Sequence, residues 1–167
     1  MSATDHKAQA PTSVACFVLT VSDTRTDATD TSGRAIRELL ERAGHSVSAR
    51  AIVRDEPTQV RAVVLERIAD PATQAIITTG GTGISARDAT FEAVTGVFEK
   101  RLDGFGELFR MLSFQEIGAA AMMSRATAGT VSRKAIFVLP GSEAAVRLAM
   151  TQLILPELGH ILQQLRK

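Results

Sequence analysis

Short apolar runs alternate with amphipathic helical patterns along the chain, and this alternation constrains the fold more than any other feature of the sequence. The runs at 14–21, 75–79 and 135–139 are typical of buried strands, and residues 45–53 alternate as a further strand does. Strands that alternate with helices favour a parallel sheet that is covered by helices on both faces. The sequence therefore predicts a three-layer α/β/α domain with a mostly parallel central sheet.

Helical patterns occupy the segments between these runs. We expect helices at 32–43, between Pro57 and Pro71, in a short segment after Asp88, at 105–118, in a turn at 119–124, and from 146 to 165. Residues 105–118 are apolar on more than one face, which predicts deep burial or a subunit contact. Pro156 lies inside the last pattern, and we expect it to kink or break that helix.

The length and net charge of the chain narrow the class of protein to which it can belong. The 167 residues fit one compact domain, and we assign residues 14–167 to this domain and the polar residues 1–13 to a flexible tail. The net charge of +1 favours neither nucleic acid nor a membrane as a partner, and no apolar run approaches the ~18 residues of a membrane span. Cys16 is the only cysteine, which is compatible with a cytoplasmic location, and we expect it in the core.

The predicted sheet brings several polar loops to one edge. In open α/β sheets, ligands bind outside the carboxyl ends of the strands. The candidate loops are those that directly follow strands, at 22–31, 54–57, 80–88 and 140–142. In the first loop we select Ser22 and Asp23, because they lie nearest the strand. The rest of that loop is typical of a solvated segment whose Asp30 or Thr31 caps the next helix.

The segment ITTGGTGISARDAT, residues 77–90, has the strongest features of a binding loop. Three glycines within four residues follow a strand, and glycine permits the positive φ that lets backbone N–H groups approach an anion. Hydroxyl side chains and a forked arginine surround them, before a helix N-terminus. The spacing matches neither GxGxxG nor a Walker loop, so a phosphate cradle and a plain turn both stay open. The candidate contacts are Thr79, Gly80, Gly81, Thr82, Gly83 and Arg87.

Two aspartates in these loops have two possible roles. Asp88 precedes the short helix and Asp55 precedes Pro57, so each has the position of an N-cap. Alternatively, the pair could hold Mg²⁺, which takes one or two carboxylates together with phosphates and waters.

The loop after the last predicted strand likewise has two possible roles, a helix cap or an anion site. Ser142 has the position of an N-cap with Glu143 in the first helical turn. Alternatively, Pro140, Gly141 and Ser142 form a helix start that faces an anion.

Several segments form a recognisable set: TVSDTRT with DTSG, TTGGTGISARDAT, DGFGELFRMLSFQEIG, SRATAG and LPGS. Together, over residues 14–155, they resemble the MoaB/MogA family of molybdenum cofactor biosynthesis proteins, to which the molybdopterin adenylyltransferase domain of gephyrin is related. DTSG and FRMLSFQEIG are more similar to the MoaB branch. The resemblance implies a MogA/MoaB-like three-layer fold, assembly as a homotrimer or homohexamer, and a cytoplasmic protein.

The resemblance also implies an activity, the Mg²⁺-dependent adenylylation of molybdopterin by ATP with release of pyrophosphate. The two family aspartates associated with catalysis fall on Asp55 and Asp88, which are then also the implied metal ligands. Ser124, in MMSRATAG, falls at an implied contact to substrate phosphate. The implied partners are molybdopterin, ATP and the downstream protein that inserts molybdate.

Two features of the sequence bear on whether this activity is present. The chain keeps both aspartates and the whole Arg87-Asp88-Ala89-Thr90 block, which favours an active enzyme. The loop at 140–142 lacks the second proline of the PGxP pattern of MogA and gephyrin, which bears on local substrate contacts. Some MoaB proteins lack these motifs and are inactive, so the alternative is a catalytically inactive module that binds molybdopterin or a partner protein.

Overall fold

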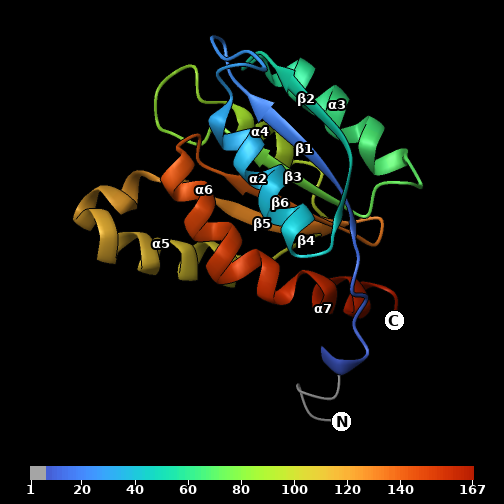
Figure 1. Ribbon diagram of the computed structural model, residues 1–167. Helices are drawn as coiled ribbons and strands as arrows, with labels where there is room; N and C mark the ends of the chain where they lie inside the picture. Colours follow the sequence, from blue (N-terminus) through green and yellow to red (C-terminus); the bar gives the residue numbers. More distant parts are fainter. Residues whose placement is uncertain (1–6) are drawn as a thin grey trace.

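The computed structural model describes residues 7–167 and shows a central sheet between layers of helices (Figure 1). The strands are β1 (Ala15–Val21), β2 (Ser46–Val53), β3 (Ala75–Thr79), β4 (Lys100–Arg101), β5 (Thr127–Val131) and β6 (Lys134–Leu139). The helices are α2 (Thr31–Arg42), α3 (Pro57–Ala69), α4 (Thr90–Thr95), α5 (Asp103–Ile117), α6 (Glu143–Ala149) and α7 (Leu155–Leu165). A 3-10 helix, η1 (Gly118–Met123), follows α5, and a π-helix, η2 (Met150–Ile154), joins α6 to α7.

The described strands form one sheet in the order β2-β1-β3-β6-β5-β4. Strands β2, β1, β3 and β6 are parallel, whereas β5 and β4 are antiparallel to their neighbours. Val21 pairs with Val53 at the ends of β1 and β2. Thr79 pairs with Thr20 on one side and with Leu139 on the other. The four parallel strands therefore end at the same level, which brings their following loops together.

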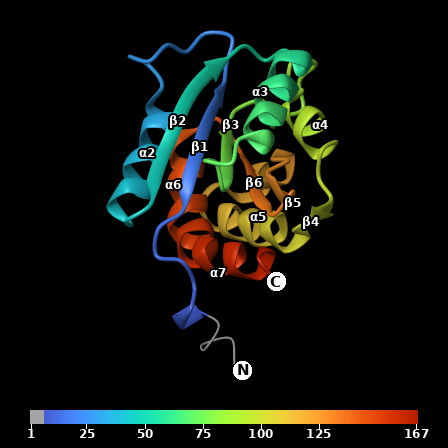
Figure 2. The same ribbon diagram turned by 90° about the vertical axis from the view of Figure 1, so that its right-hand side faces the viewer.

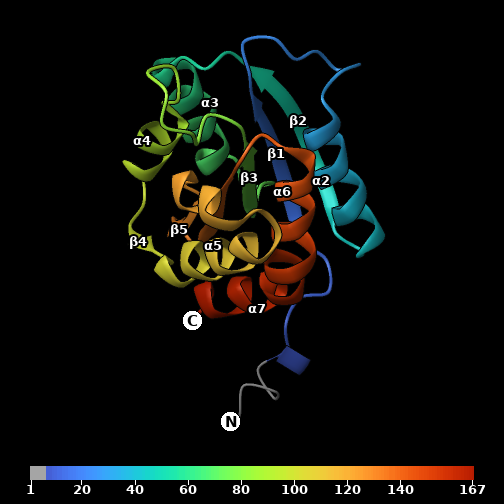
Figure 3. The ribbon, with the colours of Figure 1, turned by 90° about the vertical axis from the view of Figure 1, so that its left-hand side faces the viewer.

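The alternation of side chains along the strands divides the core between the two faces of the sheet. In β1, Cys16 and Val18 pack with α2, α5, α6 and α7, whereas Phe17 and Leu19 pack with α3 and α4. Figures 2 and 3 show α3 and α4 on one side of the sheet and α2 and α6 on the other. Burial on both faces explains why these strands are continuous apolar runs. The predicted three-layer α/β/α fold with a mostly parallel sheet is confirmed.

Strands β4 and β5 are absent from the sequence-based prediction. β5 contains Gly129, where a Cβ would lie 2.3 Å from the ring of Phe98, so the ring packs directly on the strand backbone. The β5–β6 connection turns at Ser132 and Arg133, whose φ angles are 48° and 60°. Such turns usually carry Asn-Gly or Asp-Gly. The sequence at this hairpin has neither pair, and it therefore gave no turn signal.

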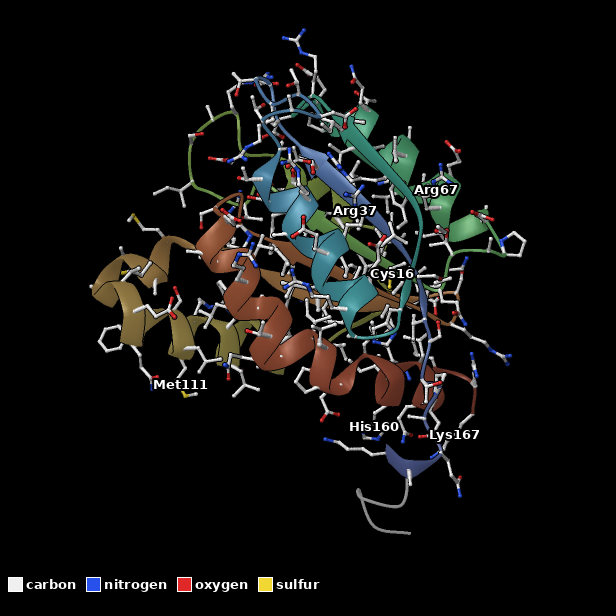
Figure 4. All side chains as sticks on the ribbon, viewed as in Figure 1. Cys16, Arg37, Arg67, Met111, His160 and Lys167 are labelled. Carbon is white, nitrogen blue, oxygen red and sulfur yellow. The ribbon has the colours of Figure 1, made fainter. Side chains whose placement is uncertain are left out.

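Helix α5 is less buried than its composition suggests. Only Gly106, Phe109 and Ser113 are buried in it. The apolar side chains of α5 and η1 that remain exposed, by 48–77%, are Leu108, Met111, Phe114, Ile117, Met122 and Met123. Figure 4 shows Met111 on the outer side of α5. The prediction of deep burial is thus wrong for the single chain, and the predicted subunit contact stays a prediction.

Pro156 does not interrupt the last helical region. It occupies the first turn of α7, directly after the π-helix η2. Proline lacks an N–H group and clashes with the carbonyl four residues before it, and the wider π turn accommodates both defects. Within residues 7–167, no helix is both long and apolar enough to cross a bilayer.

The described part of the predicted tail lies against α7. Lys7 forms an ion pair with Glu157. The carbonyl oxygen of Pro11 lies 2.5 Å from the place that a Cβ of Gly159 would take. Residues 1–6 lie outside the described residues, and the flexibility of residues 1–13 stays a prediction.

Candidate functional site

The loops selected from the sequence meet at the carboxyl edge of the sheet. Figure 1 shows the loops after β1, β2 and β3 at one end of the molecule. The Thr79 hydroxyl donates a hydrogen bond to the carbonyl of Pro140 at 2.7 Å, which joins the loops after β3 and β6. The backbone N–H of Asp55 donates to Asp23 at 3.1 Å, which joins the loops after β2 and β1. These bonds make one composite site from segments far apart in the sequence.

The glycine loop needs its glycines because other groups approach its backbone closely. Gly80 and Gly81 have φ angles of 101° and 70°, which confirms the expected positive φ. A Cβ at Gly80 would lie 2.2 Å from the carbonyl oxygen of Val21. A Cβ at Gly81 would lie 2.0 Å from Oγ1 of Thr90 and 3.1 Å from Oδ2 of Asp55. The loop therefore packs directly against a candidate catalytic carboxylate.

Asp55 is buried and incompletely hydrogen-bonded. It is 8% exposed, and its Oδ1 has no hydrogen-bond partner in the described structure. Burial raises the pKa of the Asp55 carboxyl, the N–H of Ala89 opposes this shift, and the negative charges of Asp88 and Asp23 add to it. Glu56, not Asp55, is the N-cap residue of α3, so the capping interpretation of Asp55 is wrong. A buried carboxylate oxygen without a partner is costly and indicates a role in binding.

Asp88 lies against Gly83, the last glycine of the loop. Its Oδ2 accepts hydrogen bonds from the backbone N–H of Ser85 at 2.9 Å and from the Ser85 hydroxyl at 2.6 Å. A Cβ at Gly83 would lie 2.7 Å from the same Oδ2. The bonds from Ser85 lower the pKa of the Asp88 carboxyl, which therefore stays ionised. The N-cap residue of α4 is Ala89, so Asp88 closes its own loop and does not cap the helix.

Arg87 bridges the loops after three strands. Its Nη2 lies 2.9 Å from Oδ2 of Asp23 and 3.1 Å from Oε1 of Glu56. Nε and Nη2 both donate to Asp23, so this pair is bidentate. The pairing lowers the pKa of the Asp23 carboxyl through the hydrogen bonds from Arg87. The guanidinium selected from the sequence for phosphate is thus already engaged by two carboxylates.

A cavity of about 350 Å³ opens between the loops after β1, β3 and β6. Five residues selected from the sequence line it, together with Thr20, Val21, Arg25 and Ser32: Ser22, Thr79, Gly80, Gly141 and Ser142. Arg25 and Ser32 were not among the residues predicted from the sequence. Both reach Gly141, because the Ser32 hydroxyl donates to its carbonyl at 2.7 Å and Arg25 does so at 3.5 Å.

Several hydroxyl groups in this cavity also hold the local backbone. Ser142 caps α6 by accepting a hydrogen bond from the N–H of Ala145 at 3.2 Å, which confirms the capping interpretation. Ser22 Oγ accepts a hydrogen bond from the N–H of Arg25 at 3.0 Å. Asp30 caps α2, as expected, through the N–H of Gly33 at 2.9 Å. The cavity is therefore shaped by caps and turns as well as by the glycines.

Ser124 does not line the cavity of Ser22 and Gly80. It lies beside a second cavity of about 280 Å³, together with Phe91, Arg110 and Arg125. The second cavity adjoins the glycine loop, since the backbone N–H of Arg125 donates to the carbonyl of Thr82 at 3.3 Å.

Sequence reasoning missed two residues at the glycine loop. Thr90 has a buried hydroxyl beside Gly81 that finds no hydrogen-bond partner among residues 7–167, and Arg125 makes side-chain contacts to the loop. The sequence signals that could have identified them were their positions in the RDAT and SRATAG segments.

Residues 7–167 offer oxygen atoms that suit a cation, but no complete cluster of metal-binding side chains. In residues 7–167, no group of three or more histidine, cysteine or acidic side chains is arranged to hold a metal ion. Oδ1 of Asp55 and Oγ1 of Thr90 are both buried without hydrogen-bond partners, and both residues lie against Gly81. Oxygen donors of this kind fit Mg²⁺, which keeps several waters and takes few protein ligands.

Comparison with known proteins gives consistent matches over nearly the whole chain. Residues 17–160 match the family described as "Probable molybdopterin binding domain". Molybdenum cofactor biosynthesis protein B of Bacillus subtilis is 53% identical over 168 residues, which cover 100% of this chain and 99% of that protein. The protein of the same name from Staphylococcus carnosus is 48% identical over 92% of each chain.

Solved structures agree with these sequence matches. A crystal structure of molybdenum cofactor biosynthesis protein B has a TM-score of 0.91 and 51% identity, over 95% of this chain and 99% of that one. The tungsten cofactor synthesizing protein MoaB from Pyrococcus furiosus has a TM-score of 0.84 and 36% identity, over 95% of this chain and 100% of that one. The chain therefore belongs to the MoaB/MogA family of molybdenum cofactor biosynthesis proteins.

Proposed function

We propose that this protein is a molybdopterin adenylyltransferase that acts with Mg²⁺ in the cytoplasm, as a homo-oligomer. Molybdopterin and ATP are its substrates, and adenylyl-molybdopterin and pyrophosphate are its products. The observation that carries the proposal is the placement of two carboxylates, Asp55 and Asp88, against the glycines of one loop. Membership of the MoaB/MogA family supports it, because a domain of this kind is described as probably molybdopterin-binding.

The reaction requires positioning of two polyanions more than it requires acid–base groups. An oxygen of the molybdopterin phosphate attacks the α-phosphorus of ATP, the new P–O bond forms, and pyrophosphate leaves with the electron pair of the broken bond. The nucleophile is already an anion, so no base has to remove a proton. Charge neutralisation and orientation then supply most of the rate. This explains why a site without a histidine can suffice.

The residues of the chain divide this work between the two sides of the glycine loop. Asp55, Asp88 and Thr90 would hold Mg²⁺, which when bound neutralises charge on the ATP phosphates. The ionised state of Asp88 suits that role, since the Ser85 hydrogen bonds lower the pKa of its carboxyl. In the cavity beyond Gly80, Arg25 and the start of α6 supply positive potential for a phosphate group.

Isosteric substitutions test the two aspartates directly. We expect Asp55→Asn and Asp88→Asn to keep the fold but to lose ATP- and Mg²⁺-dependent AMP transfer to molybdopterin. Asp70→Asn is the matched control, because Asp70 follows α3 and its carboxylate accepts hydrogen bonds from its neighbours Arg67, Ala72 and Thr73. Full activity in both aspartate variants would show that the pair is not catalytic. Unfolding of both variants would assign them a structural role.

A second candidate function is a binding module that holds molybdopterin without transferring AMP. The observation that favours it is the engagement of Arg87 by Asp23 and Glu56, which leaves this cation neutralised. Titration calorimetry separates the two functions. The enzyme must bind Mg-ATP as well as molybdopterin, whereas the module binds molybdopterin with no heat from Mg-ATP.

A further inference from the structure

Arg125 makes contacts with both ends of the glycine loop. Its Nε donates hydrogen bonds to the carbonyls of Gly83 at 3.0 Å and Thr82 at 3.4 Å. Its Nη2 donates to the carbonyl of Asp88 at 3.1 Å. One guanidinium group thus connects the first part of the loop with the residue that carries the candidate catalytic carboxylate.

The guanidinium is itself held from two sides. Its Nη1 forms an ion pair with Glu92 in the first turns of α4. Its central carbon lies 5.0 Å from the centre of the Phe91 ring, which is a cation–π distance. The Arg125 side chain is 28% exposed, so it is partly shielded from water. A planar group with fixed donors, stacked on a ring and paired with an acid, can keep a defined orientation.

The loop segment between the two anchors is also held by Arg87, whose guanidinium pairs with Asp23 and Glu56. Residues 84–87 are exposed, and Ile84 is 70% exposed. Inside the loop, the Asp88 carboxylate is turned back onto Ser85. The carbonyl contacts of Arg125 act on the backbone, whereas the Ser85 contacts act on the carboxylate. Arg125 therefore anchors the backbone of Asp88 directly, and this anchor remains when the Asp88 carboxylate exchanges Ser85 for another partner.

We propose that Arg125 is a positioning residue that holds the 82–88 loop in place, so that Asp88 lies where adenylyl transfer needs it. The proposal rests on the proposed function for its catalytic consequence, but its structural part concerns the loop alone. Arg125 contacts the carbonyls of the loop and is assigned no contact with the reacting atoms. Lysine cannot replace it, because an ammonium group has no fork that reaches Gly83 and Asp88 together.

The chain provides a matched control. Arg101 lies over the ring of the same aromatic residue, with its guanidinium carbon 5.8 Å from the Phe91 ring centre. Arg101 pairs with Asp103 and makes no described hydrogen bond to residues 82–88. Arg101→Gln therefore removes the same charge and the same kind of ring contact without removing the loop anchors.

Amide hydrogen exchange tests the structural part without any substrate. The amides to follow belong to Ser85, Asp88 and Thr90, which donate within the loop. In Arg125→Lys and Arg125→Gln, we expect their exchange to rise by about 10- to 100-fold, as loss of charge-assisted hydrogen bonds would produce. In Arg101→Gln, exchange at these amides should equal that of the unaltered protein.

Steady-state kinetics then test whether the position of the 82–88 loop affects adenylyl transfer. We expect Arg125→Lys to lower kcat by about 10- to 100-fold with little change in KM, since displacement of a catalytic group has this effect. Asp88→Glu keeps the carboxylate but displaces it, so this variant should retain a reduced, measurable kcat. In an Asp88→Glu background, Arg125→Lys should lower kcat no further, because Arg125 acts through Asp88. In that background, a residue with only a structural role would lower kcat further.

Several outcomes would overturn the proposal. Unchanged exchange in the Arg125 variants would do so, as would an equal rise in Arg101→Gln or additive losses of kcat with Asp88→Glu. If neither Arg125 variant folds, Glu92→Gln removes one support of the guanidinium, and an unchanged loop in that variant would overturn the proposal. Absence of AMP transfer in the unaltered protein would refute the proposed function, while the exchange measurements would still decide the role of Arg125.

Discussion

Replacing Gly81 by alanine puts a methyl group where two side chains of the site approach the backbone. The new Cβ would lie 2.0 Å from Thr90 Oγ1, 2.8 Å from Thr90 Cβ and 3.1 Å from Asp55 Oδ2. These atoms must move, because real Cβ contacts under 3.0 Å are essentially absent. We therefore expect Gly81→Ala to lose stability and to displace the two groups that we assign to Mg²⁺.

The magnitude follows from a comparison with Gly44. Gly44 also has a left-handed φ, 88°, but its nearest neighbour, the carbonyl oxygen of Thr12, is 3.8 Å from the Cβ position. Each alanine pays roughly 1–2 kcal/mol for the left-handed backbone and regains about 0.4–1 kcal/mol from the less flexible unfolded chain. Only Gly81→Ala adds an overlap, which typically costs about 1–3 kcal/mol. For a chain of this size, that difference corresponds to a Tm about 2–12 °C lower than that of Gly44→Ala.

Thermal unfolding of both variants measures this difference, and the transfer assay measures its consequence. We expect Gly44→Ala to keep AMP transfer and Gly81→Ala to lose it. Equal Tm values together with full activity in Gly81→Ala would refute the reasoning, because the close approach of Thr90 and Asp55 would then have no energetic or functional role.

Three further predictions concern other parts of the molecule. Asp55→Asn should raise Tm in the presence of a chelator, since burial raises the pKa of this carboxyl and its ionised form is therefore a cost to the fold; a lower Tm would contradict this. Burial lowers the pKa of His45, and its Nδ1 accepts the N–H of Val14 at 3.1 Å, so the unfolded chain binds the proton more tightly. Stability should therefore fall as pH drops below about 6.5, less so in His45→Gln, as denaturant titrations at several pH values would show. Phe114, 60% exposed on α5, should lie in the predicted subunit contact, so Phe114→Glu should reduce the mass found by light scattering; a monomeric unaltered protein would contradict that prediction.

The parallel core of the fold could be predicted because its signals are local. Strand β3 was predicted at residues 75–79, where the structure has it, since five buried residues in a row are too few for a helix. Strand β5 was missed because Gly129 and small neighbours gave no strand pattern, and because Ser132 and Arg133 form a turn without glycine. What decides these segments is a partner strand and the Phe98 ring, which are tertiary contacts.

At the candidate site, too, the features with a local signal were predicted and those set by tertiary contacts were not. The strand-end rule selected the loops that hold Asp55 and Asp88, and the glycines were recognised from their close spacing directly after a strand. The capping interpretation of both aspartates failed, because the direction of a carboxylate depends on partners such as Ser85 and on the backbone of the adjoining loop. The link from Arg125 to Asp88 spans 37 residues, and no local pattern predicts it.

One measurement tests the central claim most directly: a single-turnover reaction of the purified protein with molybdopterin, ATP labelled at the α-phosphate, and Mg²⁺. We predict transfer of label to molybdopterin with one pyrophosphate released per adenylyl group, and no transfer when a chelator replaces Mg²⁺. Tight binding of molybdopterin without label transfer or pyrophosphate release would contradict the account and would identify the protein as a binding module.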